Sequence, residues 1–212
     1  MVRPPAVAGS FYPADAGELA RQVDEFCAGT ESGERTRAVA CVVPHAGYMY
    51  SGHVAGAVYG ELYPPHRYIL LGPRHYPQGQ PMAILSEGSW RTPLGDAEID
   101  APLAAALLDA CPRLRDDELA HAREHSLEVQ IPFLQRMVSN GSGFRFVPVV
   151  LASDRYPVLE ELGRAVAQVI AKADADRAGP VLIIASTDLN HYESQEATHV
   201  KDSHAIDRIL AL

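Results

Sequence analysis

Three short apolar stretches of the chain are each followed by a loop that carries a histidine. The stretches and side chains are residues 38–43 with His45, residues 68–72 with His75, and residues 181–185 with Asp188 and His191. Short runs rich in Val and Ile are typical of buried β-strands. Parallel strands place their carboxyl ends at one edge of a sheet, which is where open α/β sheets bind ligands. We therefore predict that these loops meet at one functional site.

Imidazole and carboxylate side chains in such loops can bind a metal ion or transfer protons. Imidazole nitrogen suits Zn, Cu, Fe and Ni, and two histidines with one carboxylate hold the iron of non-haem Fe(II) oxygenases. The candidate donors are the nitrogens of His45, His75 and His191 and the carboxylates of Asp188 and Glu124. His191 and His125 are alternatively candidates for a general acid or base. A single histidine in such a loop is most often structural, so the convergence of several carries this inference.

Glu124 and His125 lie in the segment HAREHSLE, just before a periodic apolar pattern. The pattern predicts a helix with Leu127, Ile131, Leu134 and Val138 on one face. Pro132 would remove one backbone hydrogen bond of that helix, so we expect a kink there. A loop before the helix could aim Glu124 and His125 into the site; capping of the helix and solvation are the alternative.

Composition and charge limit the classes of partner. The chain has 212 residues, a net charge of −9 and a pI of about 5.4, which argues against general nucleic-acid binding. No stretch approaches 18 apolar residues and no signal-peptide pattern is visible, so we expect a cytoplasmic protein without a membrane partner. Three cysteines, far apart and without a CxxC pair, favour neither disulfides nor a cysteine-rich zinc site.

The order of the elements and the missing motifs narrow the fold and the chemistry further. Apolar strand patterns alternate with helical patterns along the chain, which predicts a three-layer α/β fold with at least some parallel strands. The serine-hydrolase motif GxSxG is absent, as are GxGxxG and the Walker loop, so hydrolase and nucleotide-binding functions are disfavoured. Trp90, the only tryptophan, is either part of a packed turn or a wall of the pocket.

Seven segments together resemble the Memo family, whose bacterial members are called AmmeMemoRadiSam system protein B. In order, the segments are GSFYP, PHAGYMYSG, LGPRHY, RTPLGD, EHSLEVQIPFL, VPVVL and STDLNHY. The family is similar to class III extradiol dioxygenases, which use non-haem Fe(II). The resemblance covers nearly the whole chain. It implies an α/β/α fold whose central sheet is largely parallel or mixed, with a metal-capable pocket.

The resemblance also implies roles for particular residues. His45 and His75 match the two metal-binding histidines of the family, whereas the catalytic candidates occupy other polar positions of the pocket. These catalytic candidates are Glu124, His125, Asp188 and His191. The base of a dioxygenase-like reaction is best matched by His191.

Two functions from different classes are compatible with this resemblance. The first is a redox or dioxygenase-like enzyme that uses Fe(II) or Cu, with Zn as a further option, on a small molecule. The second is a non-catalytic module that binds a peptide or a protein in the same pocket. The name of the bacterial gene cluster implies AMMECR-type and radical SAM proteins as partners.

The family's third metal ligand is a cysteine well beyond STDLNHY, and the sequence to Leu212 contains no such segment. We therefore expect a single Memo-like domain over residues 1–212 that lacks the family's C-terminal segment. A metal site short of one ligand is expected to bind weakly and to be empty or water-filled. Apolar side chains of residues 181–185 or of the strand beginning at Phe144 are expected to face water, so we expect the chain either to self-associate through that face or to fold more compactly than its relatives.

Overall fold

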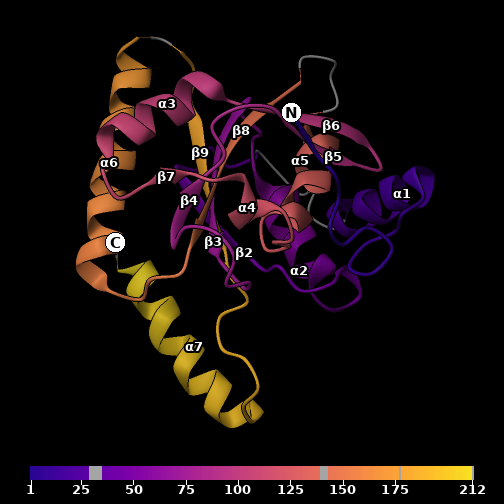
Figure 1. Cartoon of the computed structure of the whole chain (residues 1–212). Helices are drawn as coiled ribbons and strands as arrows, with labels where there is room; N and C mark the ends of the chain where they lie inside the picture. Colours follow the sequence, from indigo (N-terminus) through magenta and orange to yellow (C-terminus); the bar gives the residue numbers. More distant parts are fainter. Residues whose placement is uncertain (29–34, 139–142, 177, 212) are drawn as a thin grey trace.

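A mixed, largely parallel sheet forms the centre of the protein (Figure 1). The computed structural model describes residues 1–28, 35–138, 143–176 and 178–211. The strands are β1 (Val2–Arg3), β2 (Ala40–Val43), β3 (Arg67–Pro73), β4 (Met82–Ile84), β5 (Ser89–Thr92), β6 (Gly95–Ile99), β7 (Arg115–Asp116), β8 (Arg145–Leu151) and β9 (Val181–Ser186). Among the described residues their order is β1-β5-β6-β8-β3-β9-β2, and β4 pairs with both β8 and β7. Only β4–β8 and β5–β6 are antiparallel within this part of the chain.

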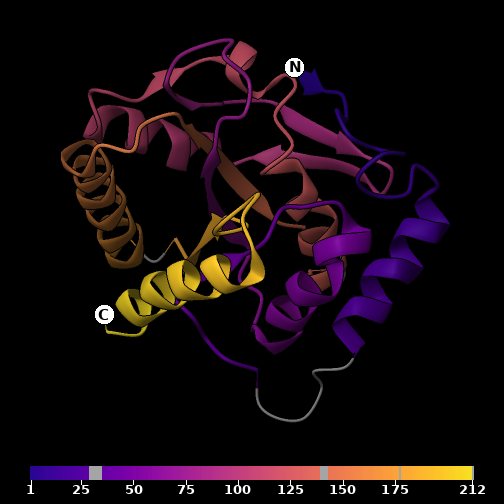
Figure 2. The same cartoon turned by 90° about the horizontal axis from the view of Figure 1, so that it is seen from below.

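Helices cover both faces of the sheet and complete the expected three layers (Figures 1 and 2). The helices are α1 (Ala16–Cys27), α2 (Tyr48–Glu61), α3 (Ala101–Ala110), α4 (Glu118–His121), the 3-10 turn η2 (Glu128–Gln130), α5 (Ile131–Met137), α6 (Tyr156–Ala175) and α7 (Gln195–Leu210). One apolar core joins the sheet to α1, α2 and α5, and a second joins it to α3 and α6. The α/β/α prediction is therefore confirmed.

The adjacent strands β3, β9 and β2 position the functional loops. All three are parallel, and β9 lies between the other two. Their carboxyl ends therefore share one edge, from which His45, His75 and the loop with Asp188 emerge. This is the convergence that the apolar runs predicted.

Local sequence signals explain where several helices begin. Asp15 and Asp100 accept hydrogen bonds from backbone N–H groups of the first turns of α1 and α3, as N-cap residues do. The expected kink at Pro132 is wrong: α5 begins at Ile131, which places Pro132 in the first turn, where proline's missing donor costs nothing. Trp90 is fully buried in β5 against Phe146, so it is a packing residue of the sheet.

The apolar side chains of β8 and β9 were expected to face water, and this prediction is wrong for most of them. Phe146, Val147, Val149 and Val150 of β8 are fully buried, and Ile184 of β9 is also fully buried. An apolar groove of about 480 Å³ nevertheless lies between α6 and the sheet. It is lined by Val39, Leu71, Leu151, Ile183 and the facing residues of α6.

Helix α7 lies beyond the carboxyl edge of the sheet in both views (Figures 1 and 2). None of its residues is buried. Within the described residues, no helix has the length and apolar content needed to span a membrane.

The contact between α1 and α2 requires glycine at Gly56. A Cβ atom there would lie 2.4 Å from the Phe26 carbonyl oxygen, which is backbone and cannot move aside. Gly163 of α6 is exposed at the groove beside the sheet, and a Cβ atom there would meet nothing within 4 Å. A side chain therefore does not fit at Gly56, whereas there is room for one at Gly163.

We predict that Gly56→Ala lowers the free energy of unfolding by about 1–3 kcal/mol because it overpacks the α1–α2 contact. Gly163→Ala should raise it by about 0.5–1 kcal/mol because alanine loses less backbone entropy in a helix. Urea unfolding of both variants measures the difference. Equal effects of the two substitutions would show that the α1–α2 contact is looser than described.

Candidate metal centre

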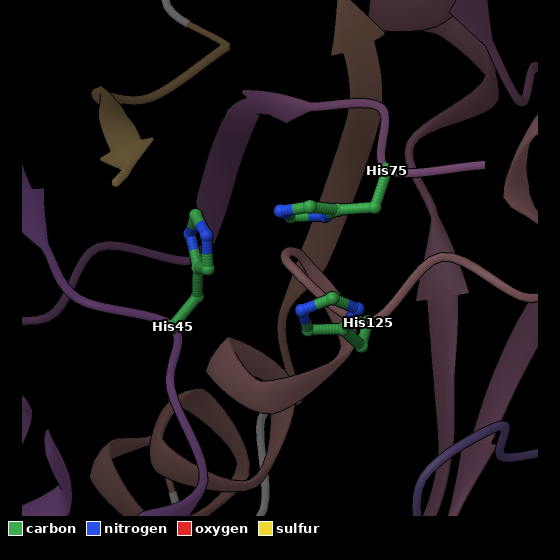
Figure 3. Close-up of side chains that lie close together, drawn as sticks. All are labelled: His45, His75 and His125. Carbon is green, nitrogen blue, oxygen red and sulfur yellow. The ribbon is translucent and has the colours of Figure 1, made fainter. Parts of the chain in front are cut away.

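Three imidazole rings point toward one another at the carboxyl edge of the sheet (Figure 3). They belong to His45, His75 and His125, and each offers one nitrogen such that the three nitrogens lie within 4.8 Å of one another. The ring centroids of His75 and His125 are 4.3 Å apart and nearly parallel. The His45 ring stands edge-on to both, at 5.3 and 5.9 Å. Such a cluster can surround a single ion.

Each ring comes from a different part of the fold. His45 follows Pro44 at the end of β2, and His75 follows β3 by two residues. His125 lies in the turn between α4 and η2. The next residue, Ser126, binds this turn to the sheet: its Oγ donates to the Pro73 carbonyl at 3.0 Å. The third ring thus reaches the edge through a tertiary contact.

The Glu124 carboxylate orients His75 and the turn that carries His125. Its Oε1 lies 2.8 Å from His75 Nδ1 and accepts from the backbone N–H groups of His125 and Ser126, each at 2.9 Å. Its Oε2 accepts from the His75 backbone N–H at 2.6 Å. Because a carboxylate faces His75 Nδ1, that nitrogen carries the proton and Nε2 keeps its lone pair.

Burial alone would raise the pKa of Glu124, but the hydrogen bonds from the His75 ring, the Ser126 N–H and the His75 N–H outweigh burial and lower it. Glu124 is therefore an ionised, fully buried group whose oxygens are already engaged. This geometry suits a positioning carboxylate, and its role as a catalytic group stays a prediction.

A buried chain of polar side chains fixes the tautomer of His45. Ser186 Oγ donates to the Ser126 carbonyl at 2.6 Å and accepts from Gln130 Nε2 at 2.8 Å. Its only proton is thereby used, so His45 Nδ1, at 3.1 Å, must donate to it. Gln130 is held in turn by Tyr59, whose hydroxyl donates to Oε1 at 2.8 Å. His45 Nε2 is left with a free lone pair.

Asp188 and His191 lie at the mouth of the cluster. Asp188 Oδ1 accepts from the backbone N–H groups of His45 and Ala46, which binds the β9 loop to the β2 loop. Asp188 Oδ2 lies 3.8 Å from His45 Nε2 and 3.4 Å from His191 Nε2. The His191 side chain is 49% exposed, whereas that of Asp188 is 11% exposed. Asp188 thus links the buried His45 ring to the half-exposed His191 ring, and the catalytic roles of Asp188 and His191 stay predictions.

The three rings have the chemistry of a metal site. Burial lowers the pKa of His45 to about 4, against an opposing effect of Asp188, and burial also lowers the pKa of His125. These imidazoles are therefore neutral at pH 7, which is the form that binds metals. His125 Nδ1 is buried without a hydrogen-bond partner in the described part of the chain. The donor set fits a borderline ion such as Fe(II), Cu or Zn.

The structure brings all six candidate residues to this edge. His45 and His75 lie edge to face with ring centroids 5.3 Å apart, and their role as metal ligands stays a prediction. His125, predicted as an acid or base, is instead the third ring of the cluster, and its acid–base role remains untested. Sequence reasoning missed Ser186, Gln130 and Tyr59, because a serine after a strand and a glutamine in a helix carry no signal of their own.

The fold and the site define an α/β protein with three histidines that could hold a metal ion, and comparison with known proteins shows its family. The family model for Memo-like proteins matches residues 3–212. A MEMO1 family protein of Methanopyrus kandleri is 43% identical, over 100% of this chain and 77% of its own length. MEMO1 family proteins of Caldivirga maquilingensis and Aquifex aeolicus are 41% and 42% identical, over 99% and 95% of this chain and 76% and 72% of their own lengths. The chain belongs to the Memo family.

His121 is a fully buried histidine behind the cluster, four residues before His125. Neither of its ring nitrogens has a hydrogen-bond partner among the described residues, and its ring packs edge-on against Trp90. Burial, with a smaller effect from the positive charge of Arg3, lowers its pKa to about 4. The unfolded chain therefore binds a proton at His121 more readily than the folded chain does.

We predict that His121 reduces the free energy of unfolding as the pH falls from about 6.5, the ordinary pKa of histidine, toward 4. His121→Leu should flatten this pH dependence by up to about 1.4 kcal/mol per pH unit. Urea unfolding between pH 4 and 7.5 measures the slope, with His53→Leu on the exposed side of α2 as the control. An unchanged slope in His121→Leu would contradict the assignment.

Proposed function

We propose that the protein is a metal-dependent redox or dioxygenase-like enzyme that acts on a small molecule. His45, His75 and His125 would hold the metal, with Fe(II) or Cu favoured and Zn as a further option. The observation that carries the proposal is the convergence of three imidazoles from three separate segments, with one nitrogen of each within 4.8 Å of the others. Membership in the Memo family, which resembles class III extradiol dioxygenases, supports the same chemistry.

The protein's own groups have separable tasks in this proposal. A bound Fe(II) or Cu ion would supply redox chemistry. Glu124 and Ser186 hold the rings of His75 and His45 so that Nε2 of each is free to bind. Asp188 and His191, 3.4 Å apart, can hold a proton at His191 Nε2 and exchange it with a substrate at the half-exposed mouth.

We predict that the protein binds Fe(II), Cu(I) or Co(II) under anaerobic conditions through these three rings. His45→Ala, His75→Ala and His125→Ala should each weaken binding by more than the roughly 10–100-fold loss typical of an outer partner. His53→Ala, an exposed histidine outside the cluster, is the control. Titration followed by visible or calorimetric signals measures affinity and stoichiometry.

Several results would count against this proposal. No binding by the unsubstituted chain would refute it. Binding that is lost with His45→Ala and His75→Ala but kept with His125→Ala would leave a two-histidine site. Equal weakening in the His53 control would mean that the titration detects surface histidines.

A peptide-binding module is the second candidate function, and a specific feature of the surface favours it. Apolar side chains next to the loops of the site are exposed to solvent: Met49 is 79% exposed, Tyr50 71% and Tyr192 fully exposed. Large exposed apolar side chains near a pocket are typical of interaction surfaces. The net charge of −9 argues against a phosphate-rich ligand.

The two functions make opposite predictions for the same variants. A peptide-binding module should keep its affinity for a peptide selected from a library when His45 and His75 are replaced by alanine, and lose it with Tyr50→Ala. If the protein is an enzyme, binding in this pocket should instead be lost when His45 and His75 are replaced by alanine. Calorimetry with the selected peptide, with and without added metal, separates the two.

A further inference from the structure

The N-terminal segment is joined to the turn that carries His125 by one buried guanidinium group. Arg3 is 3% exposed. Its Nε donates to the His121 carbonyl at 2.8 Å, and its Nη2 donates to the Glu124 carbonyl at 2.7 Å. Its Nη1 donates to Glu128 Oε2 at 2.6 Å. The plane of the group lies over the Trp90 ring, 4.2 Å from the centroid. Arg3 therefore spans the turn from its start to its end.

Glu128 completes this attachment from the other side. Its carboxylate accepts from the backbone N–H groups of Ala6 and Val7 and from the Tyr12 hydroxyl at 2.7 Å, as well as from Arg3. The carboxylate is 1% exposed, so each of these bonds lies in a site with little water. Residues 3–12 and the turn are thus a single hydrogen-bonded unit.

The same N-terminal segment touches the cluster directly. The Phe11 ring packs on the His125 ring with centroids 4.7 Å apart. The Phe11 carbonyl accepts from the Tyr48 backbone N–H at 2.7 Å, which anchors Phe11 to the start of α2 beside the His45 loop. The segment therefore packs against the His125 ring, while Arg3 holds the backbone of His121 and Glu124 in the same turn.

We propose that Arg3 is a positioning residue for the metal ligands, and this proposal rests on the metal site proposed above. Arg3 fixes the main chain of Glu124. The Glu124 side chain in turn holds the His75 ring and the His125 backbone. Arg3 touches none of the three rings, so its effect is transmitted through Glu124. One distant side chain thereby orients two of the three imidazoles.

Lysine cannot replace arginine in this role. Three of the bonds leave from three different nitrogens in fixed directions, and the planar group also stacks on Trp90. A lysine ammonium keeps the charge but is a compact point charge that lacks the rigid fork. The Arg3→Lys variant therefore removes the geometry while leaving the ion pair with Glu128.

A second buried ion pair supplies the matched control. Arg67 donates from Nε and Nη2 to Asp100 at 2.6 and 3.3 Å, and the pair is 17% and 4% exposed. Arg67 begins β3, whereas His75 follows the opposite end of that strand. Arg67→Lys is thus an equivalent change made at the far edge of the sheet.

The experiment compares Co(II) binding by the unsubstituted chain, Arg3→Lys and Arg67→Lys, with affinity and the visible spectrum as readouts. Arg3→Lys should weaken binding by roughly 10–100-fold, the range typical of groups that orient metal ligands, and should change the cobalt spectrum. Arg67→Lys should keep affinity and spectrum within about threefold of the unsubstituted chain, well short of that range. Urea midpoints of both variants show whether they lose similar stability.

Unchanged affinity in Arg3→Lys, or an equal loss in Arg67→Lys, would overturn the positioning role and leave the metal proposal intact. If the unsubstituted chain binds no cobalt, the proposed function fails, and the role of Arg3 is then decided by NMR of the metal-free protein. The His75 Nδ1 proton signal should move in Arg3→Lys and stay in place in Arg67→Lys; no selective movement would overturn the role. If Arg3→Lys does not fold, Glu128→Gln, which keeps the size of the side chain, replaces it in each arm.

Discussion

Two carboxylates with almost no access to water, Glu124 and Glu128, impose the constraint on which the site depends. An ionised carboxylate that is buried and unpaired costs about 3–5 kcal/mol, so each must find several donors. The donors to Glu124 are the ring and backbone N–H groups of His75 and a backbone N–H group in the turn of His125. The donors to Glu128 lie in residues 3–12. Burial of the Glu128 carboxylate therefore fixes together segments that are 116 to 125 residues apart, and burial of the Glu124 carboxylate joins two loops 49 residues apart.

This constraint acts together with the sheet. The parallel strands β3, β9 and β2 bring the main chain of the His45 and His75 loops to one edge, but they leave the rings free to rotate. Hydrogen bonds that the Nδ1 atoms donate, from the His45 ring to Ser186 and from the His75 ring to Glu124, remove that freedom and select the tautomer. The fold thus supplies the approximate location, and buried polar partners supply the orientation that a metal requires.

The sequence predicted the part of this arrangement that local patterns encode. Apolar runs followed by His45, His75 and Asp188 indicated strands and their shared edge, because strand composition and order are visible along the chain. The sequence indicated that His125 could enter the site but left capping and solvation as the alternative, because a ring on a turn reaches the edge through tertiary contacts of Ser126 and Glu124. Pro132 was misjudged because the pattern of apolar residues runs through η2, whereas the helix starts at Ile131.

The loop that carries Asp188 and His191 differs physically from the cluster of three histidine rings. Leu189 and Tyr192 both have a φ of 58°, a left-handed conformation that costs a residue with a side chain roughly 1–2 kcal/mol. This strained loop presents His191 at 49% exposure beside Asp188, whereas the rings of His45 and His75 are held by hydrogen bonds to Ser186 and Glu124. Hydrogen bonds to buried partners keep the rings of His45 and His75 in place, whereas the His191 ring is in contact with water. That division separates the rings that could hold a metal ion from the part of the site that is open to solvent.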